Sequence, residues 1–266
     1  MTIRRLLKKL RYAMRVNRKR LTRERNPQRD RQMKYLVRLR RRFLKAGHPV
    51  ISVDTKKREL VGPFKNAGRT WRRAPCAVLE YDYPSHADGV AIPYGIYDLA
   101  ANEGFVVVGT SHQTPEFAVA AIRRWWLKVG RFRYPTAPAL LIQADGGNPN
   151  GSRSWRWKWS LQKLADEFGL RITVTHFPPG ASKWNPIEHR LFSQISANWS
   201  GQPLFNYETV LKYLRTTKTD TGLRVRAYLD KTFYQTGLVL TAEQKAHIHL
   251  TSLRVLPEWN YIVEPW

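Results

Sequence analysis

The sequence predicts an α/β fold: a mixed five-stranded sheet flanked by helices, preceded by a basic helical N-terminal arm. Short apolar runs bounded by turn residues begin near residue 49, and helical segments alternate with the later runs. The first 45 residues carry nineteen Lys or Arg against only Glu24 and Asp30. We therefore divide the chain into a basic arm, residues 1–48, and a globular domain, residues 49–266.

The basic arm is predicted to hold two helices separated at Asn26-Pro27, because proline interrupts a helix. Two sets of apolar residues recur there at helical spacing: Leu6, Leu7 and Leu10, then Leu36, Leu39 and Phe43. Both apolar stripes are narrow, so two interpretations stay open. The helices are either solvated and packed by one edge, or they follow DNA phosphates, as blocks of like charge often do.

The globular domain contains six apolar runs with strand character: 50–54, 76–83, 90–100, 105–111, 139–144 and 170–177. The early runs follow one another in meander order. Helices predicted at 115–129 and 155–168 flank the run at 139–144, which indicates parallel pairing among the later strands. After the loop at 178–180 we expect mainly helix. The single Cys76 excludes an internal disulfide and is expected in the core.

Charge and composition narrow the class of protein. The chain has 46 Lys and Arg against 20 Asp and Glu, a formal net charge of +26, together with enough apolar residues for a sizeable core. Such a charge makes a compact fold repel itself unless a polyanion lies alongside, so nucleic acid is the expected partner. The sequence has no run of about 18 apolar residues and no signal-peptide pattern, so a membrane protein is not expected.

Two aspartates stand where strands end. Asp54 follows the apolar run 50–53 and Asp145 follows the run 139–144. An ionised Asp there costs free energy unless it is solvated, paired or bound to a cation, and two of them on adjacent strands repel unless a divalent ion lies between. Hard Mg²⁺ suits carboxylate oxygens and keeps positions open for water and phosphate oxygens. Taken singly, each Asp is also a typical turn residue.

Glu188 is the third acidic candidate. Asn185 and Pro186 are typical of a helix start, so one interpretation is that Glu188 only completes a capping box with Asn185. The other is that it shares the helix face that packs on the sheet, with Leu191, Phe192, Ile195 and Trp199. On that face it would point to the strand ends and supply a third metal-binding group.

Basic and aromatic residues beside the three acids are expected to bind DNA: Lys56, Lys57, Arg153, Lys183, Trp184 and Arg190. The cations would hold phosphates, and Trp184 would stack on a base. The alternatives are solvated surface charges and, for Trp184, core packing. His176 and His189 are expected to be structural.

Several long phrases occur in the order typical of one protein family, among them SVDTKKRELVGPFKNAGRTW, LLIQADGGNPNGSR and HFPPGASKWNPIEHRLFSQISANWSG. From about residue 50 to its end the chain closely resembles the Rhodopirellula-type DDE transposases of bacterial insertion sequences. The resemblance implies a ribonuclease H-like DDE catalytic domain in which Asp54, Asp145 and Glu188 are the catalytic and metal-binding residues. It also implies two Mg²⁺ ions, for which Mn²⁺ substitutes; Asp54 would serve both, with Asp145 at one and Glu188 at the other.

The function implied by the resemblance is transposition: DNA strand cleavage, followed by transfer of the 3′-hydroxyl end into target DNA. Element ends and target DNA would be the partners of a homodimer on DNA, in the bacterial cytoplasm at the nucleoid. Two alternatives remain: a ribonuclease H-like nuclease without strand transfer, and an inactive DNA-binding remnant. Family members usually carry a longer N-terminal region with helix-turn-helix character, so weak recognition of element ends is expected here.

Overall fold

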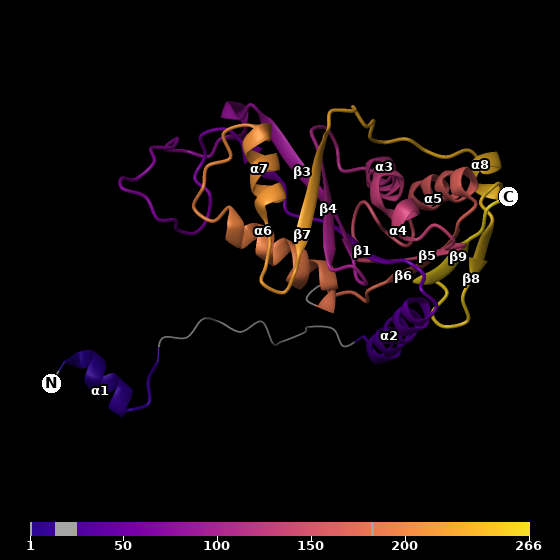
Figure 1. Cartoon of the computed structure of the whole chain (residues 1–266), viewed down its shortest axis with the longest axis horizontal. Helices are drawn as coiled ribbons and strands as arrows, with labels where there is room; N and C mark the ends of the chain where they lie inside the picture. Colours follow the sequence, from indigo (N-terminus) through magenta and orange to yellow (C-terminus); the bar gives the residue numbers. More distant parts are fainter. Residues whose placement is uncertain (1, 14–25, 182–183) are drawn as a thin grey trace.

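The protein, described as a computed structural model over residues 2–13, 26–181 and 184–266, contains one mixed sheet (Figure 1). The strand order is β7-β4-β3-β1-β5-β6-β9-β8, and β2 pairs with β3 beside this path. The strands are β1 (Val50–Thr55), β2 (Glu59–Val61), β3 (Gly89–Asp98), β4 (Glu103–Gly109), β5 (Ala139–Ala144), β6 (Arg171–His176), β7 (Arg224–Asp230), β8 (Leu250–Ser252) and β9 (Asn260–Val263).

The helices are α1 (Ile3–Lys9), α2 (Arg29–Lys45), α3 (Pro115–Trp125), α4 (Arg131–Arg133), α5 (Trp155–Phe168), α6 (Ser193–Asn198), α7 (Tyr207–Thr216) and α8 (Ala242–Ala246). Both faces of the sheet carry helices, but α1 buries no residue against it. Single π-helical turns occupy Trp126–Gly130 and Glu188–Phe192. The predicted helix at 155–168 is confirmed: the Ser154 side chain accepts from Trp157 N at its start, and Gly169 takes the left-handed conformation at its end.

The central five strands have the order and directions of a ribonuclease H-like fold, which confirms the predicted fold class. β1 pairs antiparallel with β3, and β3 with β4. On its other side β1 pairs parallel with β5, and β5 with β6. The further strands extend this five-stranded centre at both edges.

Two expectations about strands were wrong. Residues 76–83 form no strand; they lie in the long connection between β2 and β3. The chain after residue 180 is not mainly helical, because β7, β8 and β9 lie there. β7 alternates exposed Arg224 and Arg226 with buried Val225 and Ala227, a half-buried pattern of period two that a search for apolar runs does not detect.

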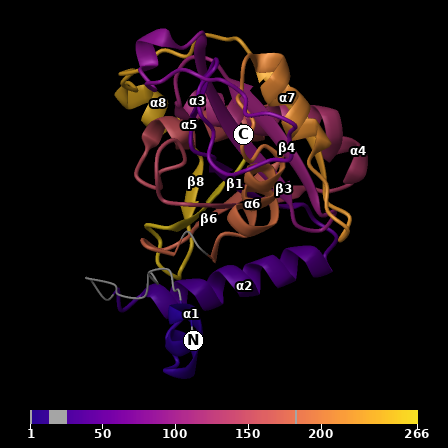
Figure 2. The same cartoon turned by 90° about the vertical axis from the view of Figure 1, so that its left-hand side faces the viewer.

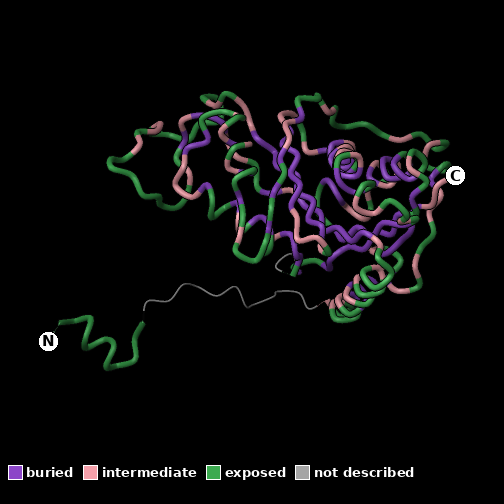
Figure 3. Tube along the Cα trace, viewed as in Figure 1, coloured by how far each residue is buried: buried purple, intermediate pink, exposed green. Residues whose placement is uncertain are grey.

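The two faces of the sheet are covered by different helices, with the strands buried between them (Figure 3). α3 and α5 pack on one face through a cluster that includes Phe117, Trp125 and Trp157. On the other face, the π-helical turn with α6 and α7 covers β3, β4 and β7, and α2 covers β1 and β5 (Figure 2). Helices therefore cover both faces of the sheet at β1 and β5, and only the ends of these strands are left uncovered.

α2 belongs to the packed body. Its Leu36 is fully buried, and the buried Gln32 side chain donates to the carbonyl of His176 at 2.8 Å. In α1, by contrast, no residue is buried. The division of the chain at residue 48 stays a prediction, as does DNA contact by the arm. Its part at 14–25 lies outside the described residues.

The C-terminal segment packs on the chain's own sheet, because β9 pairs antiparallel with β6. Cys76 was expected in the core, but it is half-buried in the loop before β3, which adds no strand to the sheet. Among the described residues, no helix has the length and apolar character needed to cross a membrane.

Candidate functional site

Asp54 and Asp145 meet at one end of the sheet. β1 and β5 are parallel neighbours in which Val53 lies opposite Ala144, so the next residue of each chain segment emerges at the same edge. Asp54 is only 7% exposed, and its carboxylate accepts a hydrogen bond from Thr55 N at 2.7 Å. The two carboxyl groups are close enough for the charge of Asp145 to raise the pKa of Asp54.

Glu188 joins the two aspartates from the other side of the strand ends. It opens the π-helical turn Glu188–Phe192, and its carboxyl group is close enough to Asp54 to raise the pKa of that aspartate. The Asn185 side chain does not cap this helix, because its Oδ1 accepts instead from Ser52 Oγ on β1. The capping-box interpretation is therefore not supported. The bond between Ser52 and Asn185, both fully buried, ties the start of the helix to β1.

Gly95 makes this close approach possible. It lies opposite Asp54 on β3, and a Cβ there would come 2.5 Å from Phe192 Cε1 and 2.9 Å from Ile187 Cδ1. Because glycine has no side chain, the helix that carries Glu188 lies directly on the strand beside Asp54. Sequence reasoning did not single out Gly95 or Ser52; a glycine inside an apolar strand is the signal that marks such an approach.

The electrostatics of the acidic site are dominated by burial and like charge. Burial is the main cause that raises the pKa of Asp54, to about 8, and the charges of Asp145 and Glu188 add to it. Burial also raises the pKa of Asp145, against a smaller lowering by the Gly147 N–H and Asn150. No Lys or Arg in the described ranges forms an ion pair with either aspartate. A proton or a cation must therefore offset this charge.

The carboxylate oxygens of the acidic site suit divalent cations. Asp145 Oδ1 is buried without a hydrogen-bond partner, which is the state of an oxygen that binds a cation. Within the described parts of the chain, no three acidic, His or Cys side chains converge on one metal position. The charges of Asp145 and Glu188 both act on Asp54. Carboxylate oxygens near one another are the ligands that hard divalent cations prefer.

A pH dependence of stability follows from the raised pKa of Asp54. The folded, metal-free protein retains on Asp54 a proton that the unfolded chain, with an ordinary Asp pKa near 3.8, has released. Its free energy of unfolding should therefore fall as the pH rises from about 4 to about 8. Urea denaturation in EDTA measures this, and Asp54→Asn should flatten the curve. An equally steep curve in the variant would assign the dependence to other groups.

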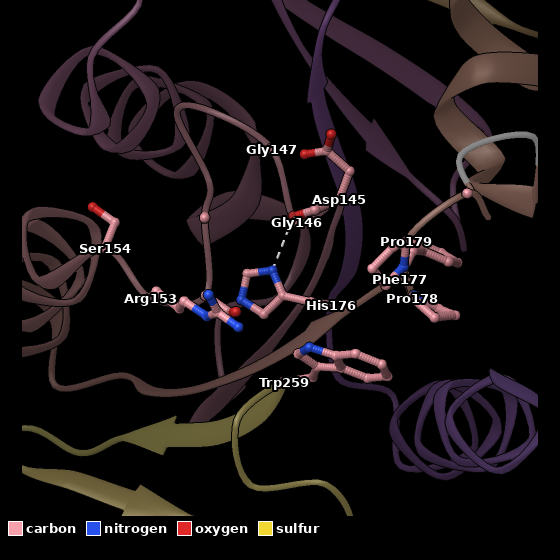
Figure 4. A pocket seen from close by; sticks show the side chains of 13 residues that line it. Asp145, Gly146, Gly147, Arg153, Ser154, His176, Phe177, Pro178, Pro179 and Trp259 are labelled. Atoms are coloured by element: carbon pink, nitrogen blue, oxygen red, sulfur yellow. Dashed lines mark hydrogen bonds between the residues drawn. The ribbon is translucent and has the colours of Figure 1, made fainter. Parts of the chain in front are cut away.

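A hollow of about 480 Å³ lies beside Asp145 (Figure 4). Arg153, His176, the loop Pro178–Gly180 and Trp259 surround it, and Asp145 stands at its rim. Arg153 is exposed there, as a phosphate-binding cation needs to be. One of the acids, a cation and an aromatic ring thus line the same hollow.

His176 lies next to Asp145 in a series of hydrogen bonds that is buried except at its Asp145 end. Trp157 Nε1 donates to Tyr261 Oη at 2.9 Å, so the Tyr261 hydroxyl hydrogen is free to bond His176 Nε2 at 3.1 Å. His176 Nδ1 then donates to the carbonyl of Asp145 at 2.9 Å. This order satisfies a neutral imidazole, and burial lowers the pKa of His176 to about 4. His176 therefore has the structural role expected of it, holding the backbone at Asp145.

Removing the hydroxyl in the middle of this hydrogen-bond series should destabilise the protein. Tyr261→Phe leaves Trp157 Nε1 and His176 Nε2 buried without partners, at about 1–3 kcal/mol each in the free energy of unfolding. Tyr97→Phe is the matched control, because the hydroxyl of the buried Tyr97 bonds the less buried Asn102, which water can reach. Chemical denaturation measures the free energy of unfolding of both variants. Equal losses would contradict the expected role of this hydrogen-bond series.

The lysines after Asp54 differ from each other. Lys56 is buried, forms an ion pair with Glu59 at 2.9 Å and lies over the Trp199 ring at 4.5 Å. Its charge already has partners within the chain. Lys57 is exposed and lines a separate hollow with Arg58. Of the two predicted phosphate contacts, Lys57 is the one presented to solvent.

The remaining predicted DNA contacts surround the start of the helix that carries Glu188. Trp184 is 55% exposed, so it is not a core residue. Arg190 is exposed and near enough to Arg40 of α2 to lower the Arg40 pKa, although burial is the larger cause. Arg40 was not among the predicted DNA contacts. It donates a hydrogen bond to the Gln143 side chain of β5 at 2.8 Å, which places a further cation beside this edge. Lys183 lies outside the described residues.

Comparisons with known proteins bear on these observations. A sequence profile described as the Rhodopirellula transposase DDE domain matches residues 1–265, so the similarity includes the basic arm. No curated protein matches the chain. Similar solved structures include the Mos1 transposase paired-end complex with left transposon end, at 14% identity and a TM-score of 0.48, over 80% of this chain and 60% of that one.

Two further structures are similar at the same low identity. A pre-cleavage Mos1 transpososome has 13% identity and a TM-score of 0.49, over 79% of this chain and 60% of that one. A simian T-cell lymphotropic virus intasome in complex with PP2A regulatory subunit B56 gamma has 13% identity and a TM-score of 0.33, over 78% and 66%. The chain thus spans about 60% of the length of the Mos1 chains.

Proposed function

The chain belongs to the family of Rhodopirellula transposase DDE domains, and on this premise we propose that it cuts and joins the DNA strands of an insertion sequence with divalent metal ions. Asp54, Asp145 and Glu188 are the proposed catalytic and metal-binding residues. One observation carries the proposal: three acidic side chains, from β1, the end of β5 and a helix start, lie near one another at one edge. Asp54 is buried, Asp145 and Glu188 are half-buried, and neither aspartate has a Lys or Arg ion-pair partner in the described ranges.

Each acid has a separate task in this proposal. Both other acids act on the pKa of Asp54, which supports a role for Asp54 at both cation positions, with Asp145 at one and Glu188 at the other. Mg²⁺ bound there, or Mn²⁺ in its place, would activate the attacking water or 3′-hydroxyl and stabilise the charge on the departing oxygen. His176 and Ser52, through Asp145 and Asn185, keep the acids in position.

The net charge of +26 supports DNA as the substrate. Arg153, Lys57 and Arg190 are exposed around the acidic edge, where they would neutralise phosphates on either side of the scissile bond. Lys183 and Trp184 complete the proposed contacts. We propose element ends and target DNA as partners of a homodimer on DNA, in the bacterial cytoplasm at the nucleoid.

The experiment that tests the proposed function separates cleavage from joining. The protein is incubated with Mg²⁺ or Mn²⁺ and labelled duplexes that end either in intact or in pre-cut element ends, with a supercoiled plasmid as target. Joining of the pre-cut 3′-hydroxyl to the plasmid is the expected result. Cleavage without joining would indicate a nuclease, and DNA binding with neither reaction would indicate an inactive remnant.

A further inference from the structure

The segment between β2 and β3 carries a charged and aromatic surface that the acidic site does not use. Residues 62–80, called here the basic loop, project from the end of the molecule beside α6 and α7 (Figure 1) and are largely exposed (Figure 3). They contain four cations, Lys65, Arg69, Arg72 and Arg73, and one acid, Glu80. None of these four cations forms an ion pair within the described chain.

The basic loop is anchored at its base. Asn66 Nδ2 donates to the carbonyls of Trp199 and Gln202 at 3.2 Å, and Gly201 N donates to Ala67 O at 2.8 Å. Gly68 lies so close to Ser200 that a Cβ would overlap the Ser200 hydroxyl. The loop is therefore held against the connection between α6 and α7, the same helical layer that carries Glu188.

Trp71 stands on this anchored loop with its side chain fully exposed, at 103%. A fully exposed tryptophan adds nothing to the stability of the fold, because its apolar surface is not buried against any neighbour. Arg69, Arg72 and Arg73 flank it. A flat aromatic ring among guanidinium groups that form no ion pair is suited to stacking on a base while the cations neutralise phosphates.

The cations of the loop continue from those next to the acidic edge. Lys57, three residues after Asp54, lines one hollow together with Arg58 and Lys65. Lys65 also lines the next hollow, with Arg69, Arg72 and Arg73. Lys65 thus links the two groups, and basic groups extend from the residues that follow β1 to the part of the loop that holds Trp71.

We propose that the basic loop binds the DNA duplex beyond the cleavage site, with Arg69, Arg72 and Arg73 on phosphates and Trp71 stacked on a base that is turned out of the helix. This inference rests on the proposed function for the presence of DNA at the acidic edge. A second protein is the less favoured partner, since four unpaired cations in a chain of charge +26 would repel another copy.

The test measures binding without cleavage, in Ca²⁺, with the full-length chain and an element-end duplex longer than the cut site. Replacing Arg69, Arg72 and Arg73 together by Gln should weaken binding and reduce the slope of log K against log salt by about one for each lost phosphate contact. The control replaces three exposed cations at the other end of the sheet, Lys163, Lys245 and Arg254, and should leave the slope unchanged.

Trp71→Ala should weaken binding about tenfold without changing the salt slope, because stacking involves no counterion release. Trp71→Phe should restore much of the affinity. Thermal melting checks that these exposed substitutions leave the fold intact. If the Arg triple variant has the wild-type slope, or if the control triple lowers it equally, the loop is not a DNA-binding element.

Two further outcomes separate the possible failures. If Trp71→Ala converts a dimer to a monomer in sedimentation while DNA affinity is unchanged, the loop binds a second copy and the inference is overturned. If the wild type binds DNA through the loop but cuts nothing with any divalent ion, the inference holds and the proposed function fails.

Discussion

Asp54→Asn, Asp145→Asn and Glu188→Gln should each abolish DNA cleavage and joining, with rates lower by about a thousandfold or more. An amide cannot replace a carboxylate as a ligand for a hard divalent cation. Each change keeps the shape of the side chain, and none adds negative charge where a phosphate must approach. In buffer without divalent cations, each variant should therefore bind DNA as tightly as the wild type or more tightly.

The measurement is single-turnover cleavage of a labelled duplex in Mg²⁺ and Mn²⁺, beside a binding titration. Asp220→Asn and Glu258→Gln, which neutralise exposed acids, are the matched controls and should retain the wild-type rate. Cleavage that survives in any one of the three site variants would remove that residue from the metal site. Loss of binding together with loss of cleavage would indicate a folding defect instead.

Gly95→Ala should reduce cleavage about a hundredfold, although Gly95 carries no chemistry. The added methyl would meet Phe192 and Ile187, so the helix that begins at Glu188 must shift away from β3. A displacement of about 1 Å at a reacting group costs on this order. Overpacking should also lower the free energy of unfolding by about 1–3 kcal/mol.

Gly109→Ala is the control for Gly95→Ala. Its methyl would meet the Phe117 ring at 2.8 Å on the opposite face of the sheet, far from Glu188. It should lower stability by a similar amount and leave the cleavage rate per folded molecule almost unchanged. Single-turnover kinetics and chemical denaturation on both variants decide this. If the two variants lose activity equally, the Gly95 effect is one of stability alone.

The sequence by itself determined the centre of the fold and the place of two acids. Apolar runs of four to six residues bounded by turn residues are typical of buried strands, and the residue that follows such a strand lies at the edge of the sheet. Asp54 and Asp145 were found in this way. The excess of positive charge is likewise a property of composition, so the expectation of a polyanionic partner needed no coordinates.

Only the tertiary structure decided how the other groups are used, because their partners are distant in sequence. Glu188 is held beside Asp54 by the bond between Ser52 and Asn185 and by the missing side chain of Gly95. Residues 76–83 have the composition of a strand but form none, whereas residues 224–230 pair with β4 as β7. Pattern and composition act locally, while pairing, charge neutralisation and close approach depend on which segments the fold brings together.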